Sequence, residues 1–241
     1  MATLLKILLI SSILFIIQTT ALLTDEEKKL IVDVHNNYRA KLVLGEVPNQ
    51  PVACDMKMLT WDDALAKTAQ TWADACKLGH DTNSVRKTAE FKFVGQNYGA
   101  SWNIQNIMDA WFIEHKNYDY TLLTCSGVCG HYTQMIWANT TKIGCAATDC
   151  SAPEKNFKYG MTFVCNYGEA GNWNNYKPYI TCETGKCSLC AEGTTCNSQK
   201  LCAKDCIFPF SFKGQWYNEC VPDSRKWCSF DRMYSGSWKY C

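Results

Sequence analysis

The residue best suited to chemistry in this sequence is a histidine that opens a short expected helix. His131 lies in the block of residues 130–137, where Tyr132, Met135 and Ile136 recur at helical spacing. In the first turn of such a helix its side chain can reach out of the helix end into a cavity. A neutral imidazole can act there as a hydrogen-bonded structural group, a metal ligand or an acid–base group, and residue types alone leave these uses open.

Two more candidates stand at the ends of other expected helices. A helix capped at residues 60–63 and expected to end at Gly79 leaves His80 at its exit. A helix over residues 104–112 places Glu114 near the buried edge of its last turn. A histidine at a helix exit is more often a structural group, and a glutamate at such an edge is more often a rim charge. Both therefore keep a structural as well as a chemical interpretation.

Helices and a small sheet must position these side chains. Residues 24–27 form a capping box that starts a helix ending near residues 44–45. Residues 94–98 are expected to be extended, and residues 142–150 and 158–167 to be strands, the second with a side-chain period of two. Helices that flank a small antiparallel sheet predict an α+β fold, a three-layer α-β-α sandwich.

The N-terminus has the composition of a secretory signal peptide over residues 1–21, with Lys6 ahead of an apolar run. That run is too short to span a bilayer, and no later stretch approaches about 20 apolar residues, so we expect a secreted, extracellular protein without a transmembrane segment. Removal of the signal also removes Lys6 and leaves equal numbers of basic and acidic residues. A neutral chain gives no electrostatic reason to expect nucleic acid or an anionic membrane as a partner.

Sixteen cysteines fit an oxidising compartment and up to eight disulfides. Seven lie within residues 54–165 and nine in the last sixty residues. This marks a boundary between a part that can bury its own core and a part that must be cross-linked. Asn139-Thr140-Thr141 is an N-glycosylation sequon, which places Asn139 on an exposed loop.

Two motifs give the sequence a family resemblance. Residues 130–137 (Gly-His-Tyr-Thr-Gln-Met-Ile-Trp) resemble the first signature of the CAP superfamily of cysteine-rich secretory, antigen 5 and pathogenesis-related proteins, and residues 163–172 resemble its second. The similarity runs over residues 24–179 and is nearest to the glioma pathogenesis-related type. It implies an α-β-α CAP domain over residues 22–180, with His35 of the first helix in a structural role.

The resemblance also implies a cavity lined by two histidines and two glutamates, which can hold a divalent ion such as zinc. In this chain the first three positions are His80, His131 and Glu114, whereas the fourth falls on Gln96. A neutral amide cannot act as a general base and removes a negative charge from a cation site, so we expect zinc binding to be weak or absent. Two imidazoles and one carboxylate can still hold zinc with an open position. The alternative function is therefore a zinc-dependent secreted hydrolase, such as a protease.

The last part of the chain resembles two further elements. Residues 181–205 resemble the cysteine-rich hinge that follows CAP domains, and residues 206–241 resemble a fibronectin type II module. Relatives of that module bind gelatin-like collagen, choline phospholipid or glycans through an aromatic-lined face, and aromatic rings also suit choline through cation–π attraction. We expect Trp227 to be packed, and Tyr234 and Trp238 to be exposed. The candidate ligand-binding residues are Phe210, Tyr217, Trp227, Tyr234, Trp238 and Tyr240.

Family patterns also imply seven disulfides. By elimination, the two remaining cysteines, Cys54 and Cys182, are expected to pair, which would tie the CAP domain to the hinge and close a very long loop. The expected pairs are Cys54–Cys182, Cys76–Cys150, Cys125–Cys129, Cys145–Cys165, Cys187–Cys196, Cys190–Cys202, Cys206–Cys228 and Cys220–Cys241.

The sequence therefore predicts a secreted binding protein, not an enzyme, made of a CAP domain, a disulfide hinge and a type II module. The expected ligand is extracellular matrix, phospholipid or glycan. No Gly-x-Ser-x-Gly motif occurs, and cysteines committed to disulfides offer no nucleophile. Nothing in the sequence indicates the oligomeric state.

Overall fold

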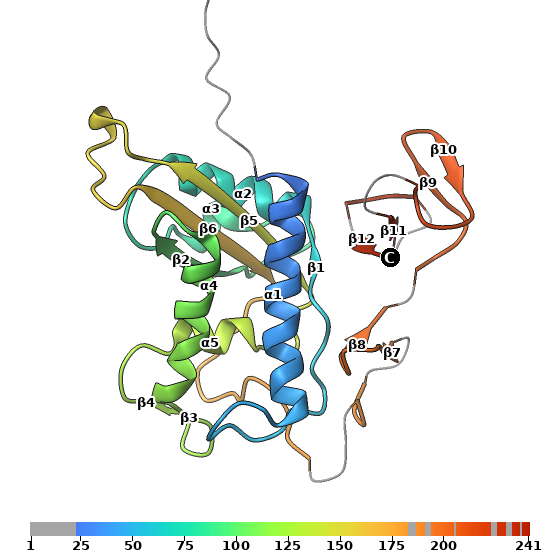
Figure 1. Ribbon diagram of the computed structural model, residues 1–241, viewed down its shortest axis with the longest axis horizontal. Coiled ribbons are helices and arrows are strands. Elements are labelled where there is room, and N and C mark those ends of the chain that lie inside the picture. Colours follow the sequence, from blue (N-terminus) through green and yellow to red (C-terminus); the bar gives the residue numbers. More distant parts are fainter. Residues whose placement is uncertain are drawn as a thin grey trace, which may run out of the picture.

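The computed structural model describes residues 23–182, 187–190, 194–204, 206–222, 226–229, 233–236 and 238–241. The expected signal peptide, residues 1–21, lies outside these residues. Figure 1 shows a helix-covered sheet in the first part of the chain, and the short strands of the hinge and the C-terminal module beside α1.

The longest helix, α1 (Asp25–Leu44), has a capping group at each end. The Thr24 hydroxyl accepts a hydrogen bond from the backbone N–H of Glu27, and the Glu27 carboxylate accepts one from the N–H of Thr24. This reciprocal capping box satisfies two of the N–H groups that a helix start leaves without partners. Gly45 ends the helix with a φ of 73°, a left-handed conformation that glycine adopts without strain.

The second helix is shorter than the sequence suggested. It is α2 (Asp63–Asp74), and Asp62 caps it by accepting a hydrogen bond from the N–H of Leu65. The expected end at Gly79 is wrong, because Cys76 adopts a φ of 50° and is tied to Cys150 by a disulfide. This cross-link turns the chain out of the helical path before Gly79 is reached.

A four-stranded sheet with the strand order β1-β5-β6-β2 lies at the centre of the domain. Its strands are β1 (Thr60–Trp61), β2 (Gly95–Ala100), β5 (Lys142–Asp149) and β6 (Met161–Gly168). β1 pairs with β5 in parallel, and the other two pairings are antiparallel. The remaining elements of the domain are α3 (Asn83–Arg86), α4 (Ile104–Ile113), η1 (Glu114–Asn117), β3 (Tyr118–Asp119), β4 (Thr124–Cys125), α5 (Gly130–Met135) and η2 (Pro153–Lys155).

Alternate residues of β5 and β6 face two different helical layers. Ala146 and Val164 pack with α2, whereas Cys145 and Phe163 belong to the main core with α1, α4 and α5. Because side chains of a strand alternate between faces, one strand pair supplies both cores. A Cβ at Gly144 would lie 2.1 Å from a backbone nitrogen of α2, so this glycine permits the close approach of the helix. The expected α+β, three-layer α-β-α fold is confirmed.

His35 joins α1 to the sheet, as its expected structural role requires. Its Nδ1 donates to the carbonyl of Ile31 at 2.8 Å, which leaves Nε2 to accept from the Tyr167 hydroxyl at 2.9 Å. The imidazole is fully buried, and burial lowers the pKa of His35 to about 3. The ring is therefore neutral and fully hydrogen-bonded in the folded protein.

The hinge is attached to the CAP domain by backbone hydrogen bonds as well as by a disulfide. Its strands are β7 (Thr195–Cys196) and β8 (Cys202–Ala203). The N–H of Met58 donates to the carbonyl of Cys202 at 2.7 Å, and the N–H of Cys202 donates to the carbonyl of Met56 at 2.9 Å. The structure contains all eight disulfide pairs named above, including Cys54–Cys182.

The C-terminal module consists of two short antiparallel hairpins. These are β9 (Phe210–Phe212) with β10 (Gln215–Tyr217), and β11 (Trp227–Ser229) with β12 (Trp238–Tyr240). The module has its own small core, in which Phe210 and Trp227 are buried. It also contacts the CAP domain, since β12 lies beside β1.

Candidate binding and metal sites

Glu114 and His131 form a tightly bonded pair where α4 meets α5. One Glu114 carboxylate oxygen lies 2.6 Å from His131 Nδ1. The other accepts from the backbone N–H groups of His131, at 3.0 Å, and Tyr132, at 3.2 Å. The carboxylate thus caps the start of α5 and holds the imidazole through Nδ1, which leaves Nε2 as the ring nitrogen available for other chemistry.

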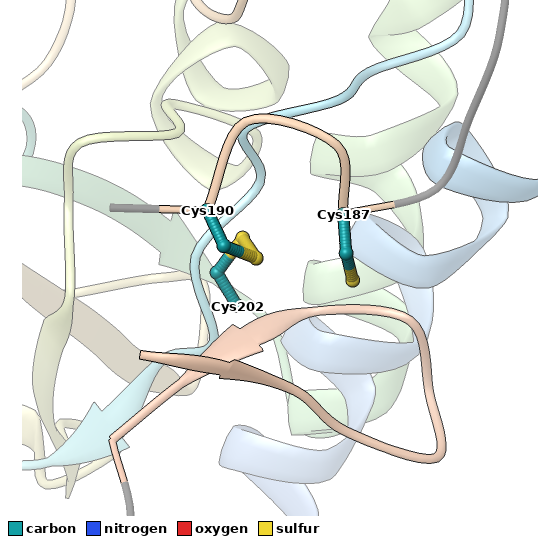
Figure 2. A group of neighbouring side chains, drawn as sticks. All are labelled: Cys187, Cys190 and Cys202. Atoms are coloured by element: carbon teal, nitrogen blue, oxygen red, sulfur yellow. A yellow bond between two sulfur atoms is a disulfide. The ribbon is translucent and has the colours of Figure 1, made fainter. Parts of the chain in front are cut away.

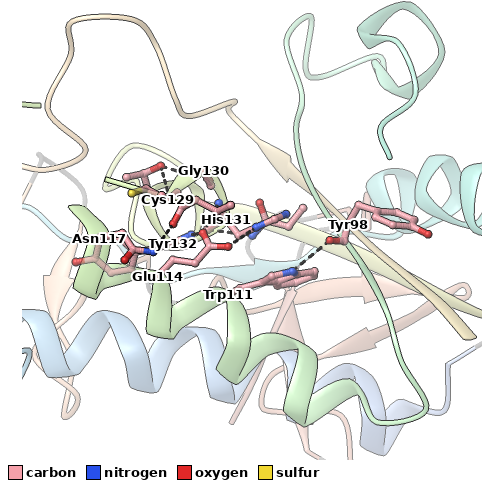
Figure 3. Close-up of polar contacts among 12 residues, drawn as sticks. Tyr98, Trp111, Glu114, Asn117, Cys129, Gly130, His131 and Tyr132 are labelled. Atoms are coloured by element: carbon pink, nitrogen blue, oxygen red, sulfur yellow. Dashed lines mark hydrogen bonds and ion pairs between the residues drawn. The ribbon is translucent and has the colours of Figure 1, made fainter. Parts of the chain in front are cut away.

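A stacked tryptophan and hydrogen bonds around it also hold the ring of His131. Trp111 stacks on it with ring centroids 5.7 Å apart and an interplanar angle of 13°. The Trp111 indole donates to the carbonyl of Tyr98 at 3.3 Å, and Asn97 donates to the carbonyl of His131 at 3.0 Å. Figure 3 shows Glu114 and Trp111 beside His131, and the hydrogen bond between Trp111 and Tyr98. His131 is therefore a positioned imidazole.

His80 and Gln96 form a second pair. His80 Nδ1 lies 2.9 Å from the amide oxygen of Gln96. The Gln96 amide nitrogen donates to the side-chain oxygens of Asp81 and Asn166, each at 3.0 Å. Burial raises the pKa of Asp81, although the guanidinium of Arg86 at 3.5 Å opposes this shift. Gln96 thus donates to two acceptor oxygens, which the carboxylate that the resemblance implied at this position could not do when ionised.

The structure does not gather the three expected metal ligands. Among the described residues, His80, Glu114 and His131 are not a group whose ligand atoms lie within 4.8 Å of one another. Both Glu114 oxygens already accept from N–H groups, and the fourth position is the amide of Gln96. In this arrangement the three side chains do not present their ligand atoms together, and weak or absent zinc binding stays a prediction.

Two groups of three cysteine sulfurs do lie within 4.8 Å of one another. One consists of Cys187, Cys190 and Cys202 in the hinge, and the other consists of Cys206, Cys228 and Cys241 in the module. Figure 2 shows the disulfide between Cys190 and Cys202, with Cys187 beside it. Metal binding requires thiolates, and every cysteine of this chain is in a disulfide, so these groups are cross-links.

The module's candidate ligand-binding rings fall into two sets. Phe210 and Trp227 are buried, and Tyr217 stacks on Phe210 with centroids 5.5 Å apart. These three rings build the module's own core, in line with the expectation for Trp227. Phe210 and Trp227 therefore serve as scaffold, whereas Tyr217 is half-buried at the edge of this core.

The other set lies against the CAP domain. The Tyr234 hydroxyl donates to Asp63 at 3.3 Å, and the Tyr240 hydroxyl donates to the carbonyl of Asp25 at 3.1 Å. Trp238 packs against the main core of the CAP domain. The expectation that Tyr234 and Trp238 are exposed is therefore wrong, because both are half-buried at a contact that the module's sequence alone does not reveal.

Two exposed rings of the module were missed from the sequence. Trp216 is 52% exposed and Phe208 is 40% exposed. Strand alternation could have found the first, because Tyr217 points into the core and its neighbour on β10 must then point away. No comparable signal marks Phe208, whose neighbour Phe210 is fully buried.

Comparison with known proteins gives two matches to family models. The cysteine-rich secretory protein (CAP) family matches residues 32–167, and the fibronectin type II domain matches residues 206–241. Human GLIPR1-like protein 1 is 40% identical over 172 residues, which cover 68% of this chain and 66% of that protein. Human peptidase inhibitor 16 is 36% identical over 204 residues, which cover 81% of this chain and 41% of that protein. The alignments thus leave about a third or more of each relative unmatched.

Solved structures show the same fold. Venom allergen-like protein 4 of Schistosoma mansoni superposes with a TM-score of 0.59 at 28% identity, over 67% of this chain and 97% of that one. NaASP2, solved with Zn²⁺, gives a TM-score of 0.59 at 28% identity, over 74% of this chain and 96% of that one. Within the described residues, no helix combines the length and the apolar character needed to cross a membrane.

Proposed function

The chain belongs to the cysteine-rich secretory protein family, and from this premise we propose that it is a secreted binding protein that attaches to collagen-type extracellular matrix through its type II module. The observation that carries the proposal is that this short module leaves large apolar side chains in solvent. Trp216, Phe208, Ile207 and Met233 are all at least 40% exposed. Exposed apolar groups at this density are typical of interaction sites.

Aromatic rings favour a collagen-type ligand for a physical reason. Collagen chains adopt the polyproline II conformation, and proline-rich strands of this kind dock on aromatic-lined surfaces with little loss of conformational entropy. Rings such as Trp216 also supply a large contact area with few rotatable bonds, which is why aromatic residues dominate binding energies at interfaces. Phosphatidylcholine and glycans are the competing ligands.

The polar groups of the CAP domain support binding over catalysis. Glu114 is used as a helix cap, and Gln96 is a neutral amide that cannot act as a base. All cysteines are in disulfides, and among the described residues no serine or threonine hydroxyl is hydrogen-bonded to the His131 ring. A hydrolase would need an activated nucleophile or a metal-bound water at this place.

The test is retention of the purified full chain on gelatin, phosphorylcholine and glycan resins. We expect retention on gelatin, with apparent affinity reduced at least about tenfold in Trp216→Ala and Phe208→Ala. Trp102→Ala is the matched control, because Trp102 is 66% exposed on the CAP domain. Trp216→Ala should change the free energy of unfolding by less than about 0.5 kcal/mol, so lost retention would not reflect unfolding. Retention on another resin alone, or on none, would contradict the matrix proposal.

A zinc-dependent hydrolase is the second candidate, and one observation favours it. The 2.6 Å contact between Glu114 and His131 Nδ1 resembles the way a carboxylate orients a catalytic histidine. This candidate requires zinc-dependent peptide or ester cleavage that His131→Ala abolishes. We expect no such cleavage and, by calorimetry, weak or no zinc binding. Turnover at the rate of ordinary hydrolases would replace the binding proposal.

A further inference from the structure

A second feature of the CAP domain takes no part in the chemistry considered so far. A groove of about 670 Å³ runs beside the turn that carries the sequon Asn139-Thr140-Thr141. Asn139 itself lines this groove, together with Trp173, Tyr176 and Glu169. Trp173 is 46% exposed and Tyr176 is 70% exposed, so two ring faces are available in it.

The side chain of Asn139 is held in an orientation that suits modification. Lys57 Nζ donates to its amide oxygen at 2.8 Å. Within the described part of the chain, the amide nitrogen makes no hydrogen bond. That nitrogen is the atom to which an N-glycan is joined, whereas the oxygen stays free to accept from Lys57 after the glycan is attached. Asn139 is also exposed, so a glycan on it does not clash with the core.

We propose that Asn139 carries an N-linked glycan and that the first sugars of this glycan lie in the groove against Trp173 and Tyr176. A pyranose ring has an apolar face of C–H groups that can cover an aromatic ring, and its hydroxyls can bond to a carboxylate such as Glu169. The groove therefore matches the two chemical sides of a sugar.

The covalent link to Asn139 explains why the groove would hold this chain's own glycan and not a free sugar. A free sugar that bound two exposed rings would lose translational and rotational freedom, which weak stacking does not offset. A glycan joined at the edge of the groove has already lost that freedom, and its effective concentration at the rings is high. Contacts that are too weak to capture a separate ligand are then sufficient to hold a tethered one.

The first test is chemical. The full chain is secreted from a eukaryotic host, and mass spectrometry of the peptide with Asn139 should find the glycan. The rate of enzymatic glycan removal is then measured under native conditions. We expect removal to be at least several-fold faster in Trp173→Ala and Tyr176→Ala than in the unsubstituted chain, because the linkage is no longer covered. Trp102→Ala is the control and should not change the rate.

The second test is thermal. Removal of the glycan should lower the Tm of the unsubstituted chain by about 2–4 °C, and that of the Tyr176→Ala chain by much less. Tyr176→Ala protects the comparison against misfolding, since this side chain lies mostly in solvent whereas Trp173 also contacts Phe93. An unmodified Asn139, or equal removal rates and equal Tm shifts in all chains, would overturn the proposal. None of these readouts involves the type II module, so they are independent of the gelatin result.

Discussion

The polar cluster of the CAP domain and the aromatic surface of the type II module differ in how their groups are satisfied. In the CAP domain, Glu114, His131, His80 and Gln96 are all engaged with one another or with the backbone. In the module, Trp216 and Phe208 remain in solvent. Groups that satisfy each other stabilise a fold, whereas exposed apolar groups gain free energy only when something else covers them. The difference supports a structural role for the first region and the proposed binding role for the second.

Removal of the Glu114 carboxylate should have the largest effect. Glu114→Ala leaves the N–H groups at the start of α5 and His131 Nδ1 without their acceptor, and we expect a loss of about 2–4 kcal/mol in the free energy of unfolding. Urea denaturation of the disulfide-intact chain measures it. Glu154→Ala, at an exposed glutamate of η2, should change stability by less than about 0.5 kcal/mol. Equal effects of the two substitutions would remove the argument that the cluster is structural.

A carboxylate at position 96 should also destabilise the CAP domain. Gln96→Glu replaces a donor to Asp81 and Asn166 by an acceptor, and we expect a loss of about 1–3 kcal/mol near pH 7. The loss should shrink as the pH falls toward about 4, because protonation of either carboxyl restores a donor. Gln215→Glu, at an exposed residue that begins β10, is the control. A large gain in zinc affinity with unchanged stability would favour the family metal site.

The buried His35 predicts how stability depends on pH. Its folded-state pKa is about 3, below the ordinary value of 6.5, so the unfolded chain binds a proton that the folded chain does not. The contribution of His35 to stability is therefore complete above pH 6.5. It declines by about 1.4 kcal/mol per pH unit below that value. Denaturation at pH 7 and pH 5.5 measures the slope, which should be smaller in His35→Gln. An unchanged slope would mean that other groups dominate the pH dependence.

The contact between module and CAP domain should show the smallest effect. Tyr240→Phe removes one hydrogen bond to the carbonyl of Asp25, and we expect a stability change below about 1 kcal/mol. Hydrogen exchange at the start of α1 should nevertheless become faster, because the module loosens there. Tyr159→Phe, at an exposed tyrosine of the CAP domain, should leave that exchange unchanged. If Tyr240→Phe also strengthened gelatin retention, the half-buried rings would have to be included in the binding surface.

Much of the secondary structure of this protein could be predicted from local sequence. The capping box of α1, the strands β5 and β6 and the signature at residues 130–137 are set by residues near one another in the chain. The end of α2 was not predictable in this way. It depends on the link between Cys76 and Cys150, whose 74-residue separation no helix-ending rule takes into account.

By itself the sequence determined the fold class, the family and the chemical character of each region, because these depend on residue types and short spacings. Only the tertiary structure decided which of those residues meet. It paired His80 with Gln96 and Glu114 with His131. It also covered Tyr234 and Trp238 with the CAP domain while leaving Trp216 in solvent. The physical reason is that a hydrogen bond or a buried ring needs contact within a few ångströms, and distances between distant parts of a chain are set by packing.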